Sequence, residues 1–63
     1  MDYTLKDFAT GQRVQMHPAT DLWMRGARYG NVVKIGRKLV TVKLDALSHA
    51  IATAPMNLIP CEV

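Results

Sequence analysis

Cysteine, acidic residues and long hydrophobic runs are all scarce in this 63-residue chain. The single cysteine, Cys61, excludes an internal disulfide and a cluster of thiolate ligands, and such scarcity is typical of a reducing cytoplasm. No stretch approaches the ~20 apolar residues of a membrane-spanning helix. The opening Met1-Asp2-Tyr3 lacks the basic and apolar regions of a signal peptide. We therefore expect a cytoplasmic protein with no membrane partner, while association into an oligomer stays open.

Metal ligands and catalytic groups are sparse as well. His17, His49 and Cys61 stand far apart without C-x-x-C or H-x-x-x-H spacing, so we expect no metal site. Ser48 and His49 are neighbours on a predicted strand and point to opposite faces, which excludes a catalytic triad. Asp45 and His49 are expected to fix a turn. The sequence thus predicts a protein with no cofactor and no enzymatic activity.

Two runs rich in β-branched residues, Asn31–Ile35 and Leu39–Leu44, occupy the middle of the chain. Such residues fit a pleated, half-buried surface. Gly36-Arg37-Lys38 separates the runs, and a glycine that opens a short polar connection indicates a hairpin. Apolar and polar residues alternate in the second run, which is the period of a strand with one buried face. These features predict a central β-hairpin.

Shorter elements are predicted on both sides of this hairpin. Further strands are expected at Gln12–His17, at His49–Thr53 and from Leu58 to Val63. Pro18 ends the first of them, because proline cannot donate to a strand ladder. The loop Pro18–Gly26 that follows contains one helical turn capped by Thr20-Asp21.

The two remaining segments complete an all-β layout. Met1–Ala9 is predicted to be an arm or a single turn that places Phe8 on the core, and Ala54–Asn57 a 3₁₀ turn before the last strand. The sum is a five-stranded SH3-like barrel over residues 11–63, with a long first loop, preceded by an N-terminal arm over residues 1–10. The expected core is Val14, Val33, Val40, Val42, Ile51 and Leu58, with Met16, Leu44 and Phe8. A bulge between Val32 and Val33 would exchange their orientations, so that choice stays open.

Three stretches carry a resemblance to a known family: Gly11-Gln12-Arg13-Val14, Gly30 to Ile35 and Val40 to Asp45. They resemble the KOW-type subset of SH3-like barrels, which implies RNA or protein partners. The longer, less basic loop Pro18–Gly26 is instead similar to the small standalone SH3-like proteins of phages and mobile elements. SH3-like dihydrofolate reductases carry a Gln and a Tyr on their pore strand. His49–Thr53 lacks both, which argues against that activity.

Basic residues gather in the central third of the chain. No acid lies between Asp21 and Asp45, and this segment holds six of the eight lysines and arginines. They are Arg25, Arg28, Lys34, Arg37, Lys38 and Lys43. Such a group suits phosphates, so we expect nucleic-acid binding, RNA or DNA, with the first loop and the hairpin tip at one end of the barrel. The alternative is that these side chains keep the hairpins solvated and protect the strand edges against aggregation.

Two aromatic residues, Trp23 and Tyr29, flank Arg25 and Arg28 in the sequence. Trp23 and Tyr29 can stack on bases if they are exposed. Trp23 can instead plug one end of the barrel. A different class of function, a protein-interaction adaptor, would use Leu22, Trp23 and Met24 together with Tyr29. Joint exposure of the first three would favour the adaptor, and their burial would favour nucleic acid.

Overall fold

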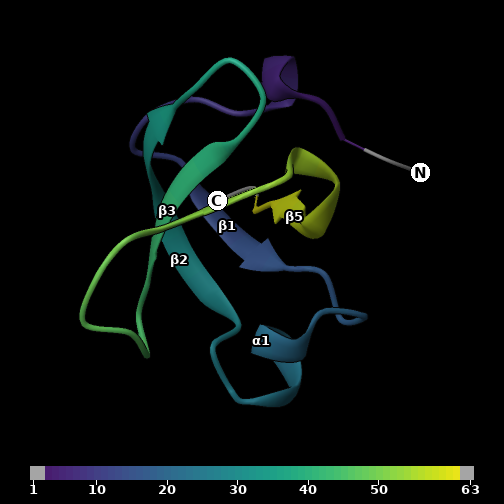
Figure 1. Ribbon diagram of the computed structural model, residues 1–63, viewed down its shortest axis with the longest axis vertical. Helices are drawn as coiled ribbons and strands as arrows, with labels where there is room; N and C mark the ends of the chain where they lie inside the picture. Colours follow the sequence, from purple (N-terminus) through teal and green to yellow (C-terminus); the bar gives the residue numbers. More distant parts are fainter. Residues whose placement is uncertain (1–2, 62–63) are drawn as a thin grey trace.

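The computed structural model describes residues 3–61 and has five antiparallel strands in one sheet (Figure 1). The strands are β1 (Arg13–Met16), β2 (Tyr29–Ile35), β3 (Val40–Leu44), β4 (Ile51–Thr53) and β5 (Leu58–Pro60). Their order in the sheet is β4-β3-β2-β1-β5, so β4 and β5 form its two edges. The predicted all-β class and the five strands are confirmed. The predicted closing strand reached Val63, and residues 62 and 63 lie outside the described part of the chain.

Three single turns of helix complete the fold: η1 (Leu5–Asp7), α1 (Asp21–Met24) and η2 (Pro55–Asn57). All three were predicted, although residues 1 and 2 of the expected arm lie outside the described residues. The cap of α1 is the predicted one, since the Thr20 hydroxyl accepts a hydrogen bond from the Trp23 N–H at 3.3 Å. None of the helices within residues 3–61 has the length and apolar character needed to cross a membrane.

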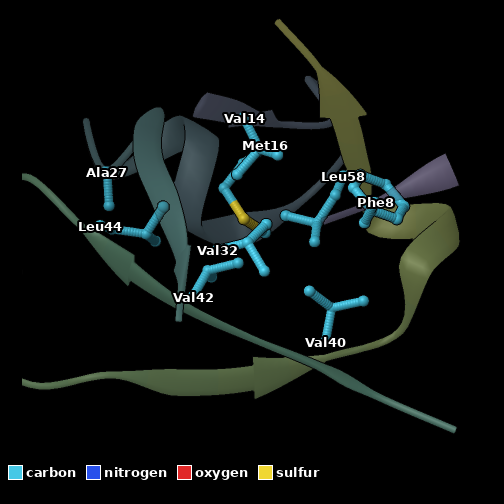
Figure 2. Packing of buried hydrophobic residues seen from close by; sticks show 9 residues of the cluster. All are labelled: Phe8, Val14, Met16, Ala27, Val32, Val40, Val42, Leu44 and Leu58. Atoms are coloured by element: carbon cyan, nitrogen blue, oxygen red, sulfur yellow. The ribbon is translucent and has the colours of Figure 1, made fainter. Parts of the chain in front are cut away.

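The hydrophobic core lies against one face of the sheet, and every strand except β4 contributes buried residues to it (Figure 2). Its buried members are Phe8, Val14, Met16, Ala27, Val32, Val40, Val42, Leu44 and Leu58. Phe8 is thus on the core, as predicted. Ile51 is half-buried and packs against this cluster instead of lying within it. Ala27, which has no periodic neighbours in the sequence, was not predicted.

A bulge in β2 determines which of the two adjacent valines, Val32 or Val33, faces the core. Val32 pairs with Val42, whereas the next pair joins Lys34 to Thr41, so Val33 is an extra residue without a partner on β3. Val32 is 2% exposed and Val33 48% exposed. The prediction that Val33 lies in the core is therefore wrong, and Val32 takes its place.

The bulge also changes which face the rest of β2 presents. Side chains alternate along a strand, so without the extra residue Lys34 would share the inner face with Val32. With it, Lys34 pairs with Thr41 and lies on the solvent-facing side of the sheet, together with Tyr29 and Asn31. We call this side the outer face. Ile35 turns inward and packs against the core.

Candidate functional site

The basic residues form two groups at opposite ends of β2. Arg25 and Arg28 lie beside α1, before the strand begins, whereas Arg37 and Lys38 lie in the β2–β3 turn after it ends (Figure 1). The seven residues of β2 separate the groups by about 20 Å, at ~3.3 Å per residue. The expectation that the first loop and the hairpin tip share one end is therefore wrong, because consecutive turns of a meander alternate between the ends of a sheet.

The loop between β1 and β2 holds the first group, which we call the aromatic end. Its backbone is fixed at both sides: the Ala27 N–H donates to the Leu22 carbonyl at 2.9 Å, and the Met16 N–H donates to the Arg28 carbonyl at 2.7 Å. Gly26 has φ +92°, a left-handed conformation that glycine adopts without strain. The loop is thus a built feature of the fold that leads directly into β2.

Trp23, Arg28 and Tyr29 form one cluster at the aromatic end. The Arg28 guanidinium lies 4.7 Å from the centre of the Trp23 ring, and its Nε donates to the Trp23 carbonyl at 3.2 Å. The Trp23 and Tyr29 rings lie 6.3 Å apart at 60°. Trp23 is half-buried against the core and covered by arginine, so it serves packing, whereas Tyr29 remains 44% exposed.

The predicted partner surface Leu22-Trp23-Met24 is divided by the fold. Leu22 and Trp23 are half-buried and pack against the core, while Met24 is 74% exposed. The three side chains therefore do not form one exposed apolar patch.

The second group, which we call the hairpin end, consists of Arg37 and Lys38 in the turn together with Lys34, the penultimate residue of β2. All three side chains are exposed. The Gly36 N–H donates to the Leu39 carbonyl at 2.9 Å and closes the turn that carries the two tip residues. Val33 and Leu39 beside them are also about half exposed. No hydrogen bond or ion pair occupies these three cations within residues 3–61, so their charges face solvent.

Lys43 behaves differently from the other predicted binding residues. Its side chain is half-buried, and its Nζ donates to the Leu44 carbonyl at 3.0 Å and to the Leu47 carbonyl. The ammonium group thus holds the turn that follows β3. Lys43 and Lys34 lie on neighbouring strands of the predicted hairpin, but Lys43 has two of its three N–H donors engaged by these carbonyls.

Sequence reasoning missed an ion pair on the outer face. The Arg13 guanidinium bonds both carboxylate oxygens of Asp45, and its NH1 also donates to the Asn31 amide oxygen at 3.0 Å. This contact lowers the pKa of Asp45 and raises the pKa of Arg13. Asp45 was expected to act with His49, but it bonds across the sheet because Arg13 and Asn31 are paired in register. The partner of Arg13 depends on the register between the strands, which the sequence alone does not show.

Other site chemistry is limited. The described residues contain no pocket and no group of three or more side chains that could hold a metal ion. The His17 Nδ1 accepts a hydrogen bond from the Ala19 N–H at 3.0 Å and so caps the loop before α1. The available chemistry is therefore that of an exposed surface with cations at two ends and a tyrosine.

Comparisons with known proteins returned no matching family model, no matching curated protein and no matching solved structure.

Proposed function

We propose that this protein is a non-catalytic module that binds single-stranded or duplex nucleic acid through the phosphate backbone. The observation that carries the proposal is the set of cations left without acidic partners. Within residues 3–61, the one ion pair uses Arg13 and Asp45, and five of the predicted basic residues keep their charge directed at solvent or stacked on an aromatic ring. They are Arg25, Arg28, Lys34, Arg37 and Lys38.

The separation of the two groups fits one ligand strand that lies along β2. Along the axis of a duplex, where each strand has one phosphate per ~3.4 Å, about 20 Å corresponds to about six phosphates, and a more extended single strand covers the same distance with fewer. The aromatic end offers arginine for bidentate phosphate contacts and Tyr29 as a stacking surface for one base. The hairpin end offers three further cations, and the bulge at Val33 directs Lys34 to the same outer face as Tyr29.

The fold that we propose for this module is the SH3-like barrel, of the KOW-like kind. The support is the strand order, in which β1 pairs with both β2 and β5, together with the long first loop and the 3₁₀ turn η2 immediately before β5. In such a barrel a strongly curved sheet encloses a small core. Its solvent-facing side is then the convex surface on which β2 and its flanking turns are presented.

The direct test is fluorescence anisotropy of labelled single-stranded RNA, single-stranded DNA and duplex DNA at two salt concentrations. Five phosphate contacts predict a log–log salt slope of about −4.5 on duplex DNA and about −3.5 on a single strand. We expect micromolar binding that weakens along such a slope. Absence of binding to all three polymers at low salt would refute the proposal and leave the basic residues as solubility features.

One observation favours a second candidate, the protein-interaction adaptor. Within residues 3–61, Met24 is the most exposed of the large apolar side chains, and it lies one residue from Trp23. A partner protein would bury it together with Tyr29. Met24→Ala would then abolish capture of that partner, whereas it would leave nucleic-acid binding unchanged.

A further inference from the structure

The two edge strands differ in the backbone groups that they leave open. On β5, the Cys61 N–H donates to the Arg13 carbonyl, so by alternation residues 58 and 60 direct their backbone groups away from β1. Pro60 has no N–H, and the Leu58 N–H donates to the Pro55 carbonyl. The outer side of β5 therefore offers carbonyls but no N–H donors from these two residues, and it is a poor template for another strand.

The outer side of β4, in contrast, offers both backbone N–H and C=O groups. The Asp45 N–H donates to the Tyr29 carbonyl, so the odd-numbered residues of β3 bond to β2, and Val40 and Val42 bond to β4. Their partners on β4 are Thr53 and Ile51. The residues between and beside these two, Ala50, Ala52 and Ala54, consequently direct their N–H and C=O groups away from the sheet. Among them, only the Ala54 carbonyl has a bond in the turns, from the Asn57 N–H at 3.0 Å.

The side chains around β4 do nothing to protect this edge. Natural edge strands are guarded by charged residues, proline or bulges. The chain has no Lys, Arg, Asp or Glu from Ala46 to Cys61, and no proline precedes Pro55 in that stretch. Ala50 and Ala52 are exposed, and within residues 3–61 the one strand that pairs with β4 is β3. Within residues 3–61 this edge therefore carries no lysine, arginine or acidic side chain and has no strand paired to its outer side.

We propose that β4 pairs with β4 of a second copy of this chain, antiparallel, about a two-fold axis at Ala52. The sequence Ala50-Ile51-Ala52-Thr53-Ala54 is suited to pairing with itself, because its outward-bonding positions are all alanine and symmetric about the centre. Ala52 then exchanges two hydrogen bonds with its own copy, and Ala50 and Ala54 bond across the axis. A carbonyl has two lone pairs, so Ala54 can accept one of these bonds beside that from Asn57.

Side chains and charge are compatible with this pairing. On the outer face only methyl groups meet across the seam, and on the inner face Ile51 lies opposite Thr53 of the second copy. Each copy carries a net charge of +3, but no charged residue lies in the segment that forms the seam, so close like-charge contacts do not oppose the approach. The product is one continuous ten-stranded sheet. The pairing does not depend on nucleic-acid binding.

The test is sedimentation equilibrium of the wild-type chain, Ala52→Lys and Gln15→Lys, from micromolar concentrations to about 1 mM, a range that detects weak dimers. Lysine at position 52 would place two residues of like charge directly opposite each other at the axis, with Cα atoms about 5.5 Å apart, and like charges directly opposite destabilise a strand pair. Gln15→Lys adds the same charge to the outer face of β1, away from the seam. We expect the wild type and Gln15→Lys to reach twice the 7.0 kDa mass of one chain, and Ala52→Lys to stay at 7.0 kDa.

Amide hydrogen exchange provides a second readout on the same samples. The Ala52 N–H should be protected at high concentration in the wild type and should exchange freely in dilute solution, whereas the Ile51 and Thr53 N–H groups, bonded to β3, stay protected throughout. Circular dichroism checks that Ala52→Lys is folded. A wild-type chain that stays at 7.0 kDa over the whole range, or a dimer in folded Ala52→Lys, would overturn the proposal.

Discussion

Arg13 and Asp45 show how a single pair of residues ties β1 to the turn after β3. The carboxylate accepts two bonds from one guanidinium, and Asn31 adds a third contact from the strand between them. Bidentate pairs of this kind fix geometry as well as charge. Because Arg13 is neutralised in this way, it does not contribute to the cations available for phosphate, although it lies on the same outer face.

The contribution of the Arg13–Asp45 pair to the stability of the fold should depend on pH. The Arg13 hydrogen bond lowers the pKa of Asp45 in the folded state. A lowered carboxyl pKa stabilises the fold fully above the unfolded-state value of about 3.9, and this stabilisation disappears as pH falls through the folded value. We therefore expect Asp45→Asn to have a lower Tm than the wild type at pH 7, and the difference to shrink as the pH falls below the unfolded-state value and through the folded-state pKa of Asp45.

Thermal unfolding followed by circular dichroism from pH 7 to pH 2 measures that difference. Arg13→Gln removes the same contact from the other side and should give the same pH profile, while the double variant should add nothing to either single change. A difference in Tm that is independent of pH would show that the pair does not act through the charge of Asp45.

At the scale of the element, the bulge in β2 is the feature with the largest consequences. It buries Val32, exposes Val33 and directs Lys34 outward. Val32→Ala should therefore destabilise the fold by about 2 kcal/mol, the cost of removing a buried valine side chain. Val33→Ala, the same chemical change one residue later, should cost less than about 0.5 kcal/mol. Urea unfolding of the two variants makes the comparison, and equal losses would contradict the bulge.

The elements themselves were largely predictable from the sequence, because the signals that define them are local. Alternation identified β1 and β3, Thr20 identified the cap of α1, and Pro55 began the 3₁₀ turn. The orientations of Val32 and Val33 could not be predicted in this way, because either residue can face the core and the choice depends on pairing with β3.

The candidate site was less predictable, because its parts come from elements that are distant in sequence. Trp23, Arg28 and Tyr29 are neighbours along one loop and the sequence pointed to all three, but it predicted that the aromatic rings stack on bases and did not predict their contacts with each other and with Arg28. The engagement of Lys43 with the turn carbonyls and of Arg13 with Asp45 requires the register across three strands. The placement of the two basic groups at opposite ends requires the topology of the whole sheet.

For the whole molecule, two basic groups about 20 Å apart imply that ligand length matters. A three-nucleotide strand has two internucleotide phosphates, too few to contact both groups, whereas seven nucleotides span about 20 Å even at the duplex rise of ~3.4 Å per nucleotide. We expect the affinity of the wild type for single-stranded oligonucleotides to rise steeply between these lengths and to level off beyond them. Isothermal titration with oligonucleotides of three to twelve residues, at one fixed low salt concentration, measures the rise.

Removal of the hairpin end should abolish this dependence on length. Arg37→Ala with Lys38→Ala leaves the aromatic end as the main contact, so short and long oligonucleotides should bind with similar affinity, and the salt slope for long ones should fall by about 1.4. The Tm should hardly change, because both side chains are exposed. Exchanging the two residues, Arg37→Lys with Lys38→Arg, keeps the charge and should preserve the wild-type behaviour. If the alanine variant kept the full rise with length, the second contact would lie elsewhere on the outer face, and the hairpin tip would have no part in binding.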